Sequence, residues 1–262
     1  MAFFDSNHGF IGTLYQTNGQ ALLETFNGGT TWQTVNLPAP VPRGLCGMEI
    51  IDATTITAVG TYYGYPEYIR SEDAGATWTT YDMSAYIGAL VDLHWFGPRN
   101  GVAVGSTAPG PNRRTVILRT NDAGATWSVR WTGTRDKEIC WKISFVNNLV
   151  GFVSIENLNS TGATYFLKTV DGGWTWSEYQ MDPNFLNCQG IGFLTEYYGW
   201  IGGWNIGTYI TRNGGTNWTW KNFGYNVNRI RFLSPSLGYA VGRDVYKYTA
   251  DPADAGTPPP PP

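Results

Sequence analysis

Short runs of alternating apolar and polar residues, separated by glycine, asparagine and aspartate, extend along the whole chain. Segments such as 101–105 (GVAVG) and 151–155 (GFVSI) combine β-branched, aromatic and small residues over only a few positions. Runs of this length and composition, bounded by turn residues, are typical of β-strands. The pattern therefore predicts an all-β fold.

One arrangement of these runs recurs along the chain. An apolar anchor is followed by a five-residue turn and then by a short strand that ends in small residues. Each copy predicts two antiparallel strands joined by a tight turn, which would form the inner pair of a small sheet. The six anchors are Phe3, Ile50, Trp95, Phe145, Phe193 and Phe232.

A second repeat, out of phase with the first, has the pattern [Ser/Thr]-x-[Asp/Asn]-x-Gly-x-[Thr/Asn]-Trp and is called the signature below. Its Asp or Asn can hydrogen-bond nearby backbone amides, and its Gly supplies a positive φ. The closing Trp offers a large surface for packing. We expect these residues to build the outer hairpin of each sheet. The five copies are Thr25–Trp32, Ser71–Trp78, Thr120–Trp127, Thr169–Trp176 and Thr211–Trp218, with Asn27, Asp73, Asp122, Asp171 and Asn213 as the turn-closing residues.

The signature tryptophans are 42 to 49 residues apart, a period typical of propeller blades. Six inner and five outer hairpins predict a six-bladed β-propeller of four-stranded antiparallel blades in a single domain, residues 1–251. A sixth signature begins at Thr249 but breaks off at Pro252, so the last blade is predicted to be incomplete. Its open edge could accept a strand from a neighbour. The predicted blades are 1–40, 41–86, 87–135, 136–183, 184–224 and 225–251, followed by a proline-rich tail or linker, 252–262.

The amino-acid composition argues against several classes of function and location. Charged residues make up 14% of the 262 residues and the net charge is −3, which argues against a nucleic-acid partner bound through its phosphates. No stretch approaches the ~20 apolar residues of a membrane span, and the N-terminus has no signal-peptide pattern. The low charge and the abundance of Asn, Thr and aromatic residues favour an extracellular, periplasmic or cell-envelope location. No cofactor is indicated.

The three cysteines lie just before inner-strand anchors and suggest no metal site. Cys46, Cys140 and Cys188 precede their anchors by four or five residues, without the close spacing of zinc ligands. We interpret them as small buried residues.

The signature resembles the Asp-box, or BNR repeat, of sialidases, xyloglucan-active glycoside hydrolases and sortilin-type receptors. The fuller repeat unit, in which a strand of glycine, aromatic and small residues precedes the signature turn, most resembles the photosystem II assembly/stability factor family of propellers. The resemblance covers residues 3–251. That resemblance implies seven blades, whereas six are counted here, and an arginine-rich face that meets a partner. Four arginines fall in loops that we place on one face: Arg43, Arg113, Arg114 and Arg135.

The first functional hypothesis is a non-catalytic binding or scaffolding propeller for a protein or polymer. Its irregular loops lie between the second and third strands of blades and between consecutive blades, and loops carry most binding residues. The candidate binding residues are Arg43, Tyr62, Tyr63, Tyr65, Arg113, Arg114, Arg135, Glu138, Trp141, Glu156 and Trp204.

Two alternatives remain open. A glycan-binding module would use exposed aromatic rings, with Tyr62, Tyr63, Tyr65, Trp141 and Trp204 as candidates. A glycoside hydrolase would need two carboxylates roughly 5–9.5 Å apart, for which Asp136 with Glu138, or Glu156 with Asp182, can be proposed. A sialidase's early Arg-Ile-Pro motif is absent, and His8 and His94 have no triad context. We expect no catalytic activity.

Overall fold

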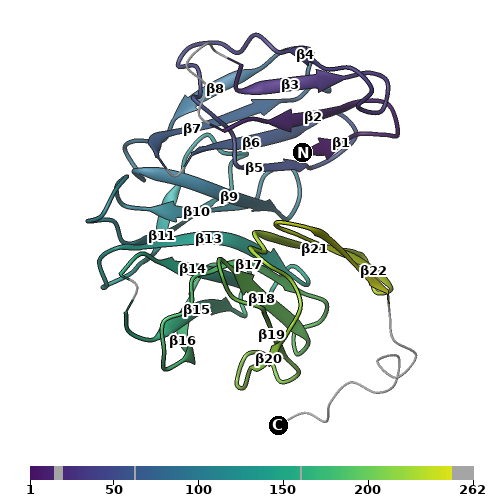
Figure 1. Ribbon diagram of the computed structural model, residues 1–262. Coiled ribbons are helices and arrows are strands. Elements are labelled where there is room, and N and C mark those ends of the chain that lie inside the picture. The colour runs from purple at the N-terminus through teal and green to yellow at the C-terminus, as the bar shows by residue number, and fades with distance from the viewer. Residues whose placement is uncertain (15–19, 62, 160, 250–262) are drawn as a thin grey trace. The chain divides into compact units, whose positions relative to one another are not determined.

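The chain folds as the six-bladed β-propeller predicted from its repeats, and Figure 1 shows its strands gathered in small sheets. The computed structural model describes residues 1–14, 20–61, 63–159 and 161–249. Within these residues there are six antiparallel sheets and no helix, and consecutive strands are neighbours in every sheet. Five sheets have four strands and the last has three. The predicted tail, 252–262, lies outside the described residues.

The chain divides into two compact units, residues 1–136 and 137–262. The prediction of a single domain therefore stays a prediction. The first unit holds three four-stranded blades, which follow one another along the chain. They are β1 (Ala2–Phe3), β2 (Gly9–Gly12), β3 (Leu22–Thr25) and β4 (Gln33–Thr34); β5 (Gly47–Ile50), β6 (Ile56–Thr61), β7 (Gly64–Ser71) and β8 (Thr79–Asp82); and β9 (Ala89–Trp95), β10 (Gly101–Ser106), β11 (Thr115–Thr120) and β12 (Ser128–Thr132).

The second unit holds two four-stranded blades and the three-stranded sixth blade. The missing fourth strand agrees with the signature that breaks off after Thr249. The strands are β13 (Glu138–Phe145), β14 (Gly151–Asn157), β15 (Thr164–Thr169) and β16 (Ser177–Asp182); β17 (Cys188–Phe193), β18 (Gly199–Gly203), β19 (Thr208–Thr211) and β20 (Thr219–Lys221); and β21 (Arg229–Ser234), β22 (Leu237–Val241) and β23 (Val245–Thr249).

The signatures form closely similar hydrogen-bonded turns between the third and fourth strands, except that the indole of Trp218 in the fifth has no hydrogen-bond partner among the described residues. In the second blade, the Ser71 hydroxyl donates to Asp73 and accepts from the amide of Gly75, both at 2.8 Å. Asp73 also accepts from the amide of Thr77, and the indole of Trp78 donates to the Gly75 carbonyl at 3.0 Å. The same contacts hold the turn at Thr120–Trp127. The turn therefore closes within one octapeptide.

Two consecutive turn residues adopt left-handed backbone. Gly75 and Gly124 have φ of 95° and 87°, and the residues before them, Ala74 and Ala123, have φ of 56° and 65°. A Cβ disfavours this region by roughly 1–2 kcal/mol. The other three signatures place glycine at both positions, so the two alanines carry local strain.

The signature tryptophans pack between neighbouring blades. The ring of Trp127 meets Tyr68 of the preceding blade and Trp95 of its own blade edge-on, with centroids 5.9 and 6.1 Å apart. In the second unit, Trp218 meets Phe166 and Phe193 in the same way, at 5.6 and 6.0 Å. Tyr68 and Phe166 are almost fully buried. These edge-to-face contacts make the aromatic core between blades.

The sixth blade departs from the register of the other five. In those five, the residue six positions after the inner-strand anchor pairs with the Ser or Thr that opens the signature, as Gly151 pairs with Thr169 and Gly199 with Thr211. In the sixth blade, Gly238 pairs with Tyr248 instead. Tyr248, not Thr249, therefore occupies the place where the signature opens. A one-residue shift turns every side chain of the strand to the opposite face.

Candidate functional site

The loops that carry the candidate residues form one end of the blades within each unit, called here the loop face. It comprises the connections between second and third strands, and those from one fourth strand to the next first strand. The opposite end carries the signature turns and is called the turn face. The candidate binding residues were predicted to lie on the loop face.

In the first unit, Arg43 and Tyr65 come together from different parts of the chain. Arg43 lies in the connection between β4 and β5, and Tyr65 lies near the start of β7. The guanidinium carbon of Arg43 is 4.0 Å from the centre of the Tyr65 ring. Both side chains are exposed, and 52% of the Tyr65 surface is accessible. An exposed cation–π pair of this kind is worth about 0.5–1 kcal/mol.

The tight hairpin between β6 and β7 presents Tyr65. Gly64 and Tyr65 both have left-handed backbone, with φ of 105° and 58°. A Cβ on Gly64 would stand 3.2 Å from Pro109, so the hairpin lies directly beside the loop between β10 and β11. Tyr63, at the hairpin tip, is 51% exposed. A non-glycine residue with positive φ is uncommon and points to a constrained site. Tyr62 lies outside the described residues.

Glu67 lies two residues beyond Tyr65, and its environment is unusual for a carboxyl group. The residue is 7% exposed, and its Oε2 has no hydrogen-bond partner among the described residues. Burial, with a smaller effect from the negative charge of Asp82, raises the pKa of Glu67 to about 7, while Arg43 acts in the opposite direction. Glu67 and Asp82 face each other in the register of β7 and β8. The cluster of Arg43, Tyr63, Tyr65 and Glu67 is called here the arginine–tyrosine cluster.

Arg113 and Arg114, two other arginines of the predicted face, both interact with the rest of the first unit. Arg114 is about half exposed, and its Nε donates to the carboxylate of Asp136 at 2.7 Å. Arg113 was expected on the surface beside Arg114, but it is only 4% exposed. That expectation was wrong, because adjacent residues entering a strand point in opposite directions. Arg135 is half-buried.

In the second unit, three candidate residues lie inside the blades. Glu138, Trp141 and Glu156 were predicted in or beside exposed loops, whereas Glu138 opens β13, Trp141 lies within it and Glu156 lies within β14. All three are buried, at 1%, 6% and 6% exposed. Their placement as surface side chains was wrong, because the strands extend further than the loop composition suggested.

Glu156 belongs to a hydrogen-bonded chain that crosses three blades of the second unit. Its carboxylate accepts from the amide nitrogen of Gln189, and the Gln189 amide oxygen accepts from Asn228, both at 2.7 Å. Gln189 is 3% exposed. Because buried polar groups are costly without partners, this chain ties the inner strands β14 and β17 to the start of β21.

Trp204 is an exposed aromatic residue of the second unit's loop face, with 44% of its surface accessible. Its neighbour Asn205 has a φ of 56° and accepts a 2.6 Å hydrogen bond from the Tyr225 hydroxyl. The guanidinium of Arg243 lies 5.7 Å from the Tyr225 ring. Tyr225 and Arg243 were missed in the sequence. The available signal was a Tyr in a connection between blades and an Arg between the second and third strands of the sixth blade.

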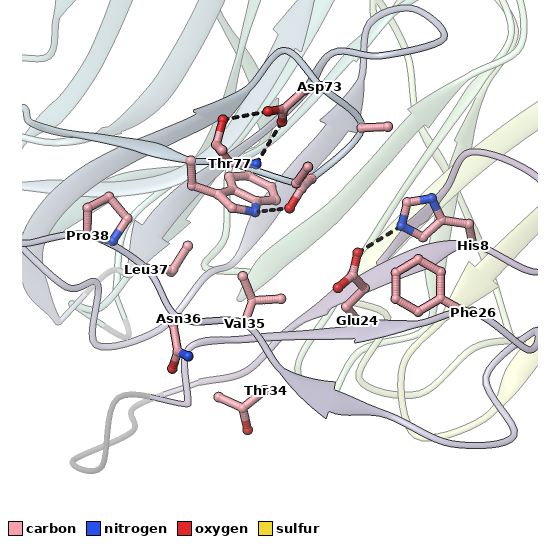
Figure 2. Close-up of a pocket in the computed structure, with 14 residues that line it drawn as sticks. His8, Glu24, Phe26, Thr34, Val35, Asn36, Leu37, Pro38, Asp73 and Thr77 are labelled. Carbon is pink, nitrogen blue, oxygen red and sulfur yellow. Dashed lines mark hydrogen bonds and ion pairs between the residues drawn. The ribbon is translucent and has the colours of Figure 1, made fainter.

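The turn face of the first unit carries a groove between its first two blades, with a volume of about 790 Å³ (Figure 2). His8 hydrogen-bonds Glu24 at 2.9 Å and stacks on Phe26 with ring centroids 4.7 Å apart. Asp73 and Thr77 of the second signature form part of its lining, and Phe26 is exposed. The aromatic stacking gives His8 a packing role.

No disulfide bond joins the three cysteines within the described residues. Burial raises the pKa of the Cys188 thiol, which keeps it protonated and unreactive. No group of three or more His, Cys, Asp or Glu residues suited to a metal ion occurs in the described ranges. Nor does that part of the chain contain a helix that is long and apolar enough to cross a membrane.

Comparison with solved structures places the architecture among known propellers. YCF48 from Cyanidioschyzon merolae shares 17% identity, with 95% of this chain and 94% of that chain covered and a TM-score of 0.53. An ancestral GH74 enzyme shares 14% identity over 97% of this chain and 39% of its own, with a TM-score of 0.69. A Hadza microbial sialidase shares 15% identity over 87% and 58%, with a TM-score of 0.54.

These likenesses show the fold. No protein-family model and no curated protein sequence matches the chain. The solved structures include YCF48, GH74 and sialidase propellers, and they do not distinguish binding from catalysis. That distinction depends on the side chains of the two faces.

Proposed function

We propose that this protein is a non-catalytic binding propeller that recognises a polypeptide partner through its loop face. The observation that carries the proposal is the pairing of Arg43 with Tyr65 at 4.0 Å, on an exposed surface built from two separate connections. Tyrosine and arginine are enriched among the residues that dominate protein interfaces. A rigid tyrosine beside a basic group can pack on a peptide and bind its carbonyl or carboxylate groups.

The constrained hairpin supports this assignment. Left-handed backbone at Gly64 and Tyr65 fixes the direction of both exposed tyrosines, so little conformational entropy is lost on binding. YCF48, which shares the fold, has been solved bound to a D1 peptide, with 17% identity, coverage of 95% and 90% of the two chains, and a TM-score of 0.50. We extend peptide recognition to this chain as part of the proposal.

A glycan-binding module is the second candidate function. Tyr63, Tyr65 and Trp204 are between 44% and 52% exposed on loop faces, and exposed aromatic rings can stack on sugars. Trp141, the other described aromatic candidate, is buried. The peptide assignment is preferred because Arg43 covers one face of the Tyr65 ring.

A glycoside hydrolase is the less favoured alternative. Solved relatives include the GH74 enzyme and the sialidase, so the fold is compatible with that chemistry. In this chain, however, three of the four carboxylates proposed as acid/base pairs have structural contacts. Asp136 binds Arg114, Glu156 binds Gln189, and Asp182 accepts from the Asn184 amide at 2.8 Å. We therefore propose a role in binding, in an extracellular or cell-envelope location.

The test is selection of binders from a random peptide phage library and, in parallel, a glycan array probed with the same protein. Peptides that bind wild type and lose affinity for Arg43→Ala and Tyr63→Ala would support the proposal. Arg99→Ala is the matched control, since Arg99 is an exposed arginine on the turn face of the same unit. Selective glycan binding that falls with Tyr63→Ala or Trp204→Ala would favour the lectin instead. Hydrolysis of a β-glucan or a sialoside would overturn both.

A further inference from the structure

A cleft with a volume of about 470 Å³ lies between the fifth and sixth blades of the second unit. Its volume lies within the range of ligand pockets. Most of the residues that line it are aromatic or apolar. The lining residues include Trp200, Thr208, Phe232, Lys247 and Tyr248.

In the other blades, the signature tryptophan occupies the position that corresponds to this cleft. Trp218 of the fifth blade packs between Phe193, the inner-strand anchor of its own blade, and Phe166 on the third strand of the preceding blade. Phe166 stands three residues before the signature that opens at Thr169. Trp127 is seated in the same way, between Trp95 and Tyr68. Both tryptophans therefore pack between one residue of their own blade and one residue of the preceding blade. We call this position the tryptophan seat and these two residues its walls.

Both walls of the sixth seat line the cleft. Phe232 is the inner-strand anchor of the sixth blade, equivalent to Phe193. Thr208 stands three residues before the signature that opens at Thr211, equivalent to Phe166. Phe232 also packs against Trp200, with centroids 5.1 Å apart, as Phe193 packs against Phe152. The cleft is thus the seat of a sixth signature tryptophan.

This seat differs from the others in two ways that leave room. The wall residue is the small Thr208, whereas the equivalent residues of the other blades are the larger Leu22, Tyr68, Ile117 and Phe166. The Oγ1 of Thr208 is buried without a hydrogen-bond partner among the described residues. The shifted register brings Tyr248 against Phe232, with ring centroids 5.4 Å apart at 82°. Tyr248 thereby reproduces the anchor contact of the missing indole, and the cleft remains beside it.

The strand next to the cleft also has an open edge. Among the described strands, β23 is hydrogen-bonded only to β22, and an open edge of this kind pairs readily with another strand. Lys247 of β23 is exposed and lines the cleft, so it would attract an acidic strand. The residues that follow, 250–262, contain six prolines and no aromatic residue. They cannot supply the indole.

We infer that this cleft and the edge of β23 receive an extended strand of a partner polypeptide. The strand pairs antiparallel with β23 as a fourth strand, places an aromatic side chain beside Thr208 and Tyr248, and sets a carboxylate near Lys247. This site lies in the second unit. It is separate from the arginine–tyrosine cluster and does not depend on the proposed function.

The chain itself provides a probe. A fluorescein-labelled peptide of residues 71–82 (SEDAGATWTTYD) contains a signature, a single tryptophan and three acidic residues. Fluorescence anisotropy should show saturable binding to the full-length protein. The Trp78→Ala peptide should bind about tenfold more weakly, as expected for loss of an anchoring residue. Lys247→Glu in the protein should weaken the binding of both peptides.

Arg130→Glu is the matched protein control, because Arg130 is an exposed basic residue on the outer strand β12 of a complete blade. It should bind the peptide as wild type does, and circular dichroism should show both variants folded. No binding at about 1 mM peptide, or equal binding of the unsubstituted and Trp78→Ala peptides, would overturn the inference. Light scattering is the second measurement. A dimer that the peptide dissociates would assign the edge to a second copy of this chain instead of a partner.

Discussion

The guanidinium carbon of Arg43 lies 4.0 Å above the ring of Tyr65, although the two residues belong to different connections of the first unit. Two residues along the strand, Glu67 is buried with a raised pKa, and the positive charge of Arg43 opposes that rise. The three residues therefore bring an exposed arginine–tyrosine pair close to a carboxyl group with a raised pKa. We expect the stability of this region to depend on pH near neutrality.

Glu67→Gln should stabilise the protein at alkaline pH. The pKa of Glu67 is raised from 4.5 in the unfolded chain to about 7 in the folded protein. The folded state thus binds the proton more tightly, and stability falls as the pH rises from about 4.5 to 7. The neutral amide removes this loss. Thermal midpoints at pH 5 and pH 8 should show the gain at pH 8 and little change at pH 5. An equal shift at both values would contradict the assignment.

Asp122→Asn should make the protein less sensitive to acid. Hydrogen bonds from the hydroxyl and amide of Thr126 hold the pKa of Asp122 below its usual range. That stabilisation is complete above the unfolded pKa of about 3.9 and is lost as the pH falls through the folded pKa. Asparagine fills the same turn position at Asn27 and Asn213. Urea titrations should show similar stability at pH 7 and a smaller loss for the variant at pH 3.

Ala123→Gly should stabilise the third blade's turn. Ala123 has a φ of 65°, whereas Gly172 and Gly214 fill the same position in the fourth and fifth signatures. Relief of the left-handed strain, roughly 1–2 kcal/mol, exceeds the entropic cost of glycine, roughly 0.5–1 kcal/mol. We expect a net gain of about 0.5–1 kcal/mol in the free energy of unfolding, measured by urea denaturation. Ala125→Gly, at an exposed position of the same turn without positive φ, should give no gain.

Trp127→Ala should destabilise the protein by about 3–5 kcal/mol, as for other buried large-to-small substitutions. Trp127 is 6% exposed and meets both Tyr68 and Trp95. Trp220→Ala is the control, because Trp220 is 52% exposed on β20. The difference between the two variants in chemical denaturation measures the contribution of the interblade seat. A loss of binding with unchanged stability in Trp127→Ala would mark Trp127 as a ligand residue.

The blades could be predicted from the sequence because each signature closes its own turn. The hydrogen bonds of Ser71, Asp73 and Thr77 lie within one octapeptide, so spacing alone locates the outer hairpins. The incomplete sixth blade followed from the same logic. The register of the sixth blade could not be predicted in this way, because the pairing of Gly238 with Tyr248 depends on which ring packs against Phe232.

The candidate site was less predictable. Residue type suggested Arg43, Tyr63 and Tyr65 correctly as exposed loop side chains, but it gave the wrong exposure for Arg113, Glu138 and Glu156. Exposure in a loop or at a strand end depends on where the strand begins and which face each side chain takes. Local composition does not specify either. Tyr225 was missed for a related reason, since its partner Asn205 lies 20 residues away.

The central claim is that the arginine–tyrosine cluster binds a polypeptide. The most direct measurement is the anisotropy titration of a library-selected, labelled peptide against wild type, Arg43→Ala, Tyr63→Ala and the control Arg99→Ala. We predict a loss of about tenfold or more in affinity for the two cluster variants, wild-type affinity for the control, and unchanged thermal midpoints for all three, since these side chains are exposed. Equal affinity of all four proteins would contradict the account.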